Sequence, residues 1–353
     1  MKHTILPSFV TLLTATLCLL SVEATAQRRW RPEAFQTDTL MVHDPVMAYE
    51  DGTFYIYSTG MGIQTATSTD LRTWTVQPRG ALSPIPSWAG DSVPGFRGHV
   101  WAPDIIHYNG LWWMTYSCST FGRNTSAIGI ASSPTLDFTD TLRCHWQDHG
   151  AIVCSRERRN DWNAIDSNIA IDDDDQPWLT WGSFWDGIQL VRLDPFTMHV
   201  APDCQPKTIA RRVAIADTLS AEPNPTSRHA GRNAIEAPFI FRHAGFFYLF
   251  VSHDYCCRGM KSNYKVAVGR SRSISGPYLD AGGRDMAQGG GTLVIEGDKQ
   301  EFEATGHCAA YHLNARQDIF ICHGYSIRHG GQAILVKKLI EWTADGWPLL
   351  KDF

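Results

Sequence analysis

One short pattern occurs five times along the chain and limits its possible folds more than any other feature. Each copy is a polar or acidic residue, a short apolar strand, a turn rich in Gly, Asn or Asp, and a second strand of bulky apolar residues. The copies begin at Asp44, Asp104, Asp166, Glu236 and His307, at intervals of 60, 62, 70 and 71 residues. Repetition at such a period, with several strands in each copy, is typical of a propeller. Five copies predict five blades.

Further strands follow the first two in each copy. In the first copy, a hairpin turn at Glu50-Asp51-Gly52 is followed by a third strand at 62–67 and an outer strand near 68–74. Alternating apolar residues and β-branched or aromatic side chains mark most of these segments, whereas helical periodicity is weak. The polar residues 27–41 could add an edge strand. The chain is therefore predicted to be all-β, a five-bladed β-propeller.

The first 26 residues are expected to lie outside this fold. A short basic start precedes a mostly apolar stretch at 6–22, and Ala24-Thr25-Ala26 is a small-x-small cleavage site. This arrangement is typical of a secretory signal peptide. The apolar stretch is interrupted by polar residues and is short for a membrane span. We expect a single propeller domain over residues 27–353, no membrane span, and a secreted or periplasmic location.

Composition narrows the classes of ligand. The chain has 13 Trp residues, a side chain well suited to flat apolar ligands such as sugar rings, although packing between blades would account for about half of them. The formal charge of −5 comes without a basic stripe, which argues against nucleic acid as a partner.

A monomer is expected. Eight Cys follow the predicted signal peptide, and neighbouring Cys256 and Cys257 are not expected to reach each other easily. Pairing of the others or free buried thiols both stay open.

The residues that begin the repeats are the candidates for chemistry. In a propeller the first strand of every blade lines a central channel, so equivalent residues converge on one rim. Crowded carboxylates push one another's pKa values apart, and this separates an acid from a base. Two carboxyl groups around a sugar-sized cavity are the machinery of glycoside hydrolysis. A strand-starting turn would explain one isolated Asp-Pro or Pro-Asp copy, but it does not require acids at four of five positions.

A set of short motifs in one order carries a more specific indication. The motifs are His43-Asp44-Pro45, Trp101-Ala102-Pro103-Asp104, Asn163-Ala164-Ile165-Asp166, Gly182-Ser183-Phe184-Trp185 with Gly187-Ile188, Glu236-Ala237-Pro238, Cys256-Cys257-Arg258-Gly259, Val268-Gly269-Arg270-Ser271, Gly276-Pro277-Tyr278 and Gly289-Gly290-Gly291-Thr292. Together they resemble family 43 glycoside hydrolases, and within that family the endo-arabinanases, from about residue 40 to 340. The resemblance implies a five-bladed propeller that hydrolyses α-1,5-linked L-arabinofuranosyl chains with inversion.

The resemblance also implies roles for the carboxylates. Asp44 resembles the general base of the family, and Glu236 resembles its general acid. Asp166 resembles a third carboxylate that raises the pKa of the acid and orients it. A nearby anion disfavours ionisation of Glu236 and so keeps a proton available near neutral pH.

Five further residues match positions with known roles in the family. His307 resembles the histidine that holds a hydrated calcium ion in the central channel; because calcium prefers oxygen ligands, waters would fill most of the coordination sphere. An alternative is that His307 only hydrogen-bonds a neighbouring acid. Trp101 and Phe121 match aromatic residues that stack on arabinose rings. His43 and Ser183 match polar neighbours of the cleavage site.

Departures from the pattern leave alternatives open. Ser167 replaces a proline, Ala304-Thr305-Gly306 replaces Gly-Pro-Gly before the histidine, and Asp186 replaces a small residue and could repel or hydrogen-bond substrate. The acidic run Asp172–Asp175 is interpreted as a solvated turn rather than a calcium loop.

An endo-arabinanase is predicted. An exo-acting arabinofuranosidase or β-xylosidase is the alternative within the fold, and a non-catalytic carbohydrate-binding propeller is the alternative outside enzymes.

Overall fold

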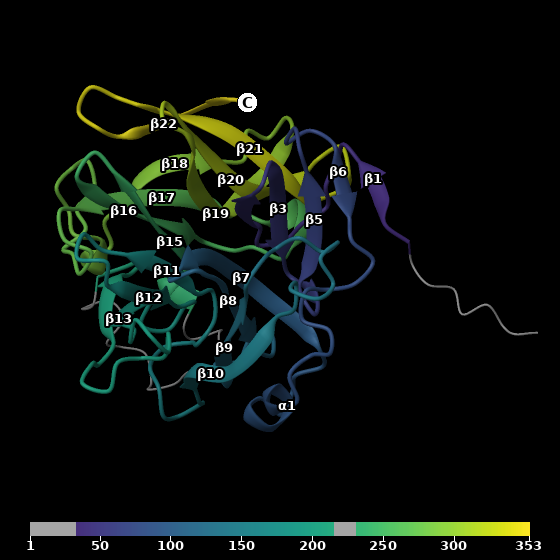
Figure 1. The fold of residues 1–353 in the computed structure, drawn as a ribbon. Coiled ribbons are helices and arrows are strands. Elements are labelled where there is room, and N and C mark those ends of the chain that lie inside the picture. Colours follow the sequence, from purple (N-terminus) through teal and green to yellow (C-terminus); the bar gives the residue numbers. More distant parts are fainter. Residues whose placement is uncertain (1–32, 215–230) are drawn as a thin grey trace, which may run out of the picture. The chain divides into compact units, whose positions relative to one another are not determined.

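The structure is a computed structural model that describes residues 33–214 and 231–353. These residues form five antiparallel sheets arranged as the blades of a propeller, and their one α-helix is the short α1 (Trp88–Ser92) (Figure 1). The predicted all-β, five-bladed propeller is confirmed. The predicted signal peptide lies outside the described residues. Residues 33–353 make one compact unit. No helix in the described part is long and apolar enough to cross a membrane.

The first two sheets contain five strands each. From its outer to its inner edge, the first sheet contains β1 (Phe35–Thr37), β6 (Trp74–Val76), β5 (Gln64–Ser68), β3 (Thr53–Ser58) and β2 (Val46–Glu50). The second contains β10 (Gln147–Ser155), β9 (Ser126–Ser133), β8 (Leu111–Cys118), β7 (His99–Tyr108) and the two-residue β4 (Gly60–Met61). β4 comes from the first repeat, so it joins the first sheet to the second.

The other three sheets contain four strands each, with the first strand in chain order at the inner edge. The third contains β11 (Asn168–Ile171), β12 (Pro177–Trp181), β13 (Ile188–Arg192) and β14 (Lys207–Ala210). The fourth contains β15 (Ile235–His243), β16 (Phe246–His253), β17 (Lys265–Ser271) and β18 (Thr292–Glu296). The fifth contains β19 (Phe302–Asn314), β20 (Gln317–Ser326), β21 (Gln332–Trp342) and β22 (Pro348–Asp352). Three short 3₁₀ helices, η1 (Gly231–Asn233), η2 (Gly259–Lys261) and η3 (Met286–Gln288), lie in connecting segments.

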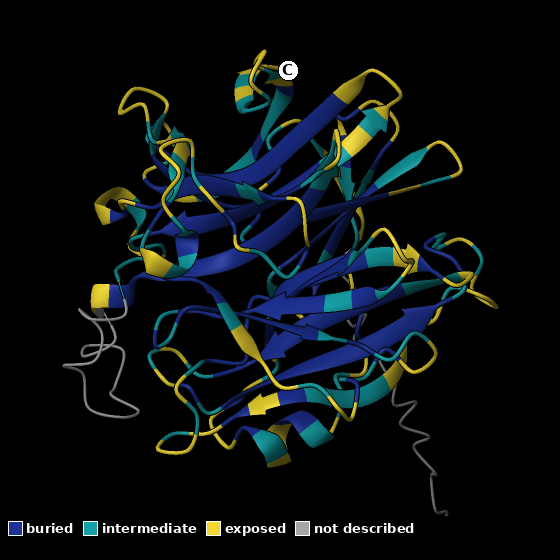
Figure 2. Cartoon of the chain, turned by 90° about the vertical axis from the view of Figure 1, so that its left-hand side faces the viewer, coloured by how far each residue is buried: buried dark blue, intermediate teal, exposed yellow. Residues whose placement is uncertain are grey.

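The innermost strands of the sheets contact one another in a closed ring. Contacts join β2 with β7, β7 with β11, β11 with β15, β15 with β19, and β19 with β2. The second strand of a blade is covered on both faces, which explains why a segment such as β16, FFYLFVSH, has no polar face. Figure 2 shows buried residues running through the strands, with exposed residues in the connecting loops.

A segment before the first blade closes the ring. Val42 N donates to Ala333 O at 3.2 Å, and Leu335 N donates to Leu40 O at 2.9 Å, so residues 40–42 pair with β21 of the fifth sheet. The edge strand expected within 27–41 is found as β1, which pairs with β6. The predicted hairpin turn joins β2 to β3; Asp51 and Gly52 both have positive φ, at 46° and 84°, as a tight turn between twisted strands requires.

Candidate active site

A similar backbone irregularity occurs in every blade, either directly before the inner strand or within its first six residues. Its central residue has a left-handed backbone although none of the five is glycine, which is uncommon. These rim residues are Asp44 (φ 55°), Ala102 (φ 39°), Asp166 (φ 58°), Ala237 (φ 52°) and His307 (φ 53°). The predicted equivalence of Asp104 and Glu236 with Asp44 is therefore wrong: Asp104 lies two residues beyond the rim position, and Glu236 lies one residue before it.

Side chains of the preceding blade hold four of these turns in place. The donors and acceptors are Asp44 N to His323 Nδ1 (3.1 Å), Ala102 N to Thr59 Oγ1 (2.8 Å), Asp166 N to Ser117 Oγ (3.1 Å) and His307 N to Ser252 Oγ (2.8 Å). Each acceptor lies in the last four residues of the second strand of its repeat or directly after that strand. Sequence reasoning missed this role, although a polar residue near that point of each repeat was a visible sign of it.

Asp44 is buried and held by three side chains. His43 Nδ1 lies 2.8 Å and His307 Nδ1 lies 3.0 Å from Asp44 Oδ1, and Thr59 Oγ1 donates to Oδ2 at 2.5 Å. Burial alone would raise the pKa of Asp44, but the charges and hydrogen bonds of His43 and His307 outweigh it and hold that pKa well below its usual value. Asp44 is therefore an ionised carboxylate, suited to accept a proton.

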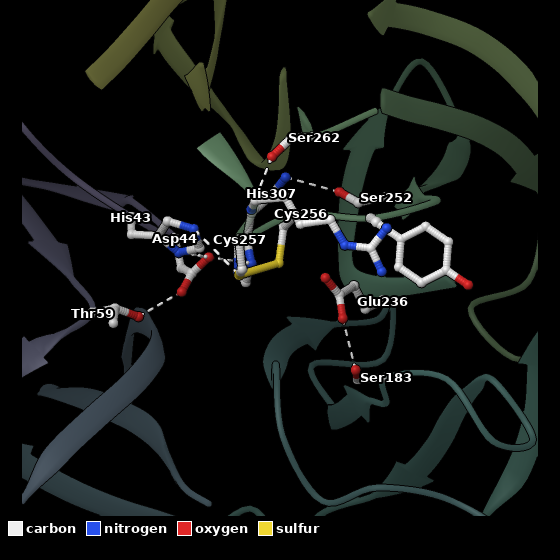
Figure 3. Close-up of a disulfide and its surroundings, with 12 residues drawn as sticks. His43, Asp44, Thr59, Ser183, Glu236, Ser252, Cys256, Cys257, Ser262 and His307 are labelled. Carbon is white, nitrogen blue, oxygen red and sulfur yellow. Dashed lines mark hydrogen bonds and ion pairs between the residues drawn. A yellow bond between two sulfur atoms is a disulfide. The ribbon is translucent and has the colours of Figure 1, made fainter. Parts of the chain in front are cut away.

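Glu236 has the opposite electrostatic environment. It is buried in β15, and Ser183 Oγ donates to its Oε2 at 2.7 Å. Burial raises the pKa of Glu236 above its usual value, and Asp44 adds to the rise; hydrogen bonds from Ser183 and Tyr264 oppose it without cancelling it. Glu236 is thus the carboxyl group that can hold a proton. In the view of Figure 3, Asp44 and Glu236 lie on opposite sides of the Cys256–Cys257 disulfide, with Ser183 below Glu236.

Asp166 lies next to the backbone that carries Glu236. Ala237 N donates to Asp166 Oδ2 at 3.2 Å. Burial raises the pKa of Asp166 well above its usual value; His307 opposes the rise, and the charges of Glu236 and Asp44 add to it. Because Asp166 and Glu236 repel each other in a buried place, they titrate as a pair and keep a proton to higher pH than either carboxyl group would alone.

Asp104 is deeper in the channel and does a structural task. Its Oδ2 accepts hydrogen bonds from Ile169 N at 2.7 Å and Asn168 Nδ2 at 3.1 Å. These contacts join the second blade to the third. Burial raises the pKa of Asp104 to about 6, and the two hydrogen bonds oppose that rise.

His307 forms an ion pair with Asp44. A contact with a neighbouring acid was the alternative to a calcium-binding role for His307. Burial lowers the pKa of His307, but Asp44 more than reverses this and raises it to about 9. Since Nδ1 faces Asp44, only Nε2 could face a metal ion. In the described part of the chain, the groups of three residues able to share an ion are His43, Cys256 and Cys257, or His43, Asp44 and His323; neither includes His307. The donor set therefore fits calcium only as an ion held mainly by water.

The predicted aromatic residues lie beside the rim rather than among the carboxylates. Trp101 precedes rim residue Ala102 in β7 and is half-buried, with its Nε1 donating to His99 Nδ1 at 3.0 Å. Phe121 follows the end of β8 that carries Ser117, and its side chain is 77% exposed. An aromatic ring left this exposed is available to a ligand.

The departures from the family pattern have local explanations. Asp186 is engaged by Arg211, with Nε 2.8 Å from Oδ1, and accepts from Thr208 Oγ1 at 2.6 Å, so its charge is neutralised within the protein. Ser167 Oγ donates to Thr115 Oγ1 at 2.9 Å. In the acidic run, Asp172 Oδ1 accepts from Asp174 N at 2.9 Å and closes a turn between β11 and β12, so the segment is a turn as predicted.

Cys256 and Cys257 form a disulfide, contrary to expectation (Figure 3). The turn that carries them follows β16 and lies against His43. The other cysteines of the described residues, at 118, 144, 154, 204, 308 and 322, are free thiols.

Comparison with known proteins shows the family of this chain. Residues 39–348 match the family described as Glycosyl hydrolases family 43. An extracellular exo-alpha-(1->5)-L-arabinofuranosidase of Cellvibrio japonicus is 40% identical over 314 residues, covering 88% of this chain and 86% of that protein. An extracellular endo-alpha-(1->5)-L-arabinanase of Bacillus subtilis is 38% identical over 312 residues, covering 87% of each.

A solved structure is similar as well. An exo-1,5-alpha-L-arabinanase from a bovine ruminal metagenomic library superposes with a TM-score of 0.81 at 48% identity, covering 89% of this chain and 98% of that one. A propeller that brings together one carboxyl group with a lowered pKa and another with a raised pKa has the base and the acid that a glycoside hydrolase requires. The chain belongs to glycosyl hydrolase family 43.

Proposed function

We propose that this chain is an inverting hydrolase of α-1,5-linked L-arabinofuranosyl chains that acts as an endo-arabinanase. The observation that carries the proposal is the opposite environment of two carboxyl groups on one rim. The pKa of Asp44 is held low and that of Glu236 is raised. Environments that push two carboxyl pKa values apart assign the base and the acid. The relatives named above act on the same linkage.

In the proposed reaction, each carboxyl group has one task. Asp44 accepts a proton from a water as that water attacks the anomeric carbon. Glu236 donates its proton to the glycosidic oxygen as the bond breaks. Asp166 keeps Glu236 protonated by repulsion, and its contact with Ala237 N holds the backbone beside the acid. Ser183 fixes the direction of the Glu236 carboxyl group through the 2.7 Å hydrogen bond.

The proposed substrate contacts use the residues around the rim. Trp101 and Phe121 would stack on arabinose rings, and Phe121 has the exposure that this requires. His43 and Ser183 would contact the sugar at the cleavage point from the two sides of the gap. The substrate is thus arabinan or an arabino-oligosaccharide.

We also propose a calcium ion beside His307, held mainly by water. What supports it is the charge of the channel: Asp44, Asp104, Asp166 and Glu236 are all buried near one another. A bound cation supplies positive charge that offsets repulsion among such carboxylates. His307 Nε2 would be its protein ligand.

Export and a monomeric state complete the proposal. Two relatives of similar length are named extracellular, and the N-terminal sequence has the composition of a signal peptide. Amino-terminal sequencing of the protein recovered from the culture medium or periplasm tests export and should begin near Gln27. Light scattering of the purified protein tests the monomer.

Exo action is the second candidate, because the relatives at 40% and 48% identity are named as exo-acting enzymes. Linear, debranched arabinan separates the two modes. Thin-layer chromatography at early times should show a ladder of oligomers for endo action, whereas one product of fixed length would show exo action. Parallel assays with an aryl β-xyloside test the xylosidase alternative. Binding of arabinan without any product would support the non-catalytic alternative.

A further inference from the structure

The Cys256–Cys257 disulfide lies at the proposed active site. In the view of Figure 3 it lies between Asp44 and Glu236, in the turn between β16 and η2. Cys257 is exposed, and its Sγ lies 3.7 Å from His43 Nε2. The roles assigned above do not use this disulfide.

A chain of hydrogen bonds leads from this turn to Asp44. Cys257 N donates to the hydroxyl oxygen of Tyr325 at 2.7 Å, and that oxygen lies 2.9 Å from His43 Nε2. His43 Nδ1 in turn lies 2.8 Å from Asp44 Oδ1. Tyr325 is buried.

The two ends of this chain have fixed donors. The carboxylate of Asp44 can only accept, so His43 Nδ1 carries the proton that it donates to Oδ1. At the other end, the N–H of Cys257 donates to the hydroxyl oxygen of Tyr325. Between them, that hydroxyl group and His43 Nε2 share one hydrogen bond. The contacts therefore form a continuous chain from the disulfide turn to the carboxylate.

The disulfide restricts the turn from which this chain starts. Cys257 has a φ of 64°, a left-handed backbone that costs a non-glycine residue free energy unless its surroundings impose it. A bond between neighbouring cysteine side chains closes a small ring that includes the peptide group between them. The N–H of Cys257 belongs to that peptide group, so the ring fixes its direction toward Tyr325.

We propose that the Cys256–Cys257 disulfide is a positioning element for the catalytic base. It holds the N–H of Cys257 against Tyr325, Tyr325 fixes the orientation of His43, and His43 orients Asp44. This inference rests on the proposed function, which makes Asp44 the base. Cys256, Cys257 and Tyr325 are positioning residues.

Reduction is the first test. A soluble dithiol reduces the disulfide with two electrons and two protons, giving two cysteine thiols and the cyclic disulfide of the reagent. This is the one disulfide in the described part of the chain, whose other cysteines are already thiols. On linear arabinan, kcat should fall about tenfold, the equivalent of one lost hydrogen bond, with KM nearly unchanged. The paired substitution Cys256→Ala with Cys257→Ala should reproduce this. Cys154→Ala, at an exposed free thiol, is the matched control and should have no effect.

Coupling to Tyr325 is the second test. Tyr325→Phe should lower kcat by a similar factor, and reducing the disulfide in this variant should then lower it by less than about twofold, because both changes break the same chain. Circular dichroism checks folding. If the variant with both Cys256→Ala and Cys257→Ala does not fold, reduction of the native protein still tests the inference.

Three results would overturn the inference while arabinan cleavage by the oxidised protein stands. One is an unchanged kcat on reduction. Another is a raised KM with unchanged kcat, which would make the disulfide a surface for sugar binding. The third is independent action: reduction lowers kcat by the same factor in Tyr325→Phe as in the native protein, so that the two effects multiply. An oxidised native protein that does not cleave arabinan overturns the proposed function itself, and the inference with it.

Discussion

His307 Nδ1 lies 3.0 Å from Asp44 Oδ1, although the two residues begin the fifth and the first repeats. The contact pairs an imidazole whose pKa is raised to about 9 with a carboxylate whose pKa is held well below its usual value. Both groups are therefore charged at neutral pH. This pair leaves the neighbouring Asp166 and Glu236 as two interacting carboxyl groups that share one proton, so that one is ionised while the other is protonated.

Asp44→Asn should lower kcat on linear arabinan by about 10² to 10⁴-fold, because the attacking water loses its base. Asp51→Asn is the matched control: Asp51 is exposed and has a similar left-handed backbone, with a φ of 46° against 55°. Release of reducing ends measures the rate. Proton NMR of the first product should show an inverted anomeric centre, and retention would contradict the role of Asp44.

Asp166→Asn should move the alkaline limb of the pH–activity profile to lower pH. Glu236 must be protonated to act, so activity is lost as pH rises through its pKa. Removing the charge of Asp166 removes repulsion and lowers that pKa. Aryl arabinosides with good leaving groups should suffer less than arabinan. Equal losses on both substrates with an unmoved profile would exclude an action through Glu236.

Ser183→Ala should move the same limb in the opposite direction. The hydroxyl of Ser183 donates to Glu236 Oε2 and so stabilises the ionised carboxylate. Without it the pKa of Glu236 rises and the alkaline limb moves to higher pH. The rate should fall about tenfold, as expected for one hydrogen bond to a charged group. A shift of the limb to lower pH would show that Ser183 does not act on Glu236 in this way.

His307→Gln should destabilise the fold in a pH-dependent way. The folded pKa of about 9 exceeds the usual 6.5, so the ion pair contributes its full stability below pH 6.5 and loses it as pH rises through 9. The contribution is at most about 3 kcal/mol. Melting temperatures of native and variant protein, measured in metal-free buffer between pH 6 and 10, should converge toward the alkaline end. A constant difference would contradict the pairing.

Chelation tests the proposed calcium ion. Removing a ligand that binds only the folded state should lower the melting temperature and activity together, and added calcium should restore both. His307→Gln should not respond to calcium. Elemental analysis of the native protein should find one metal ion for each chain. If exhaustive chelation changes neither property and no metal is found, His307 serves Asp44 alone.

The repeat predicted the blades correctly but placed two of its own members wrongly. Propeller architecture depends on the order and number of strand pairs, which the apolar segments show directly. Which residue of each repeat lies at the rim depends on irregularities in strand pairing near the start of the inner strand. Register shifts occur between Trp101 and Asp104, and between Glu236 and Phe239. Such irregularities add residues without changing the hydrophobic pattern. Asp104 therefore looked like Asp44 in sequence while its side chain bonds the next blade.

Side-chain and backbone details limited the rest of the site prediction. Asp44, His43 and His307 come together as expected, and Ser183 does contact Glu236. The disulfide was not predicted, because bonding neighbouring cysteines needs a backbone that sequence does not show. Tyr325 was missed because an aromatic residue at the end of a buried strand looks like any other core residue.

Closure of the ring by residues 40–42 has a consequence for protein synthesis. These residues pair with β21, and Asp44 takes its partners His307 and His323 from the same fifth sheet. A ribosome makes Asp44, the proposed base, among the first residues of the fold, but it makes His307 and His323 among the last. The nascent chain thus lacks these two contacts of the proposed base until nearly all of it has been translated, and we expect a product terminated before β19 to be inactive however well its first four sheets have folded.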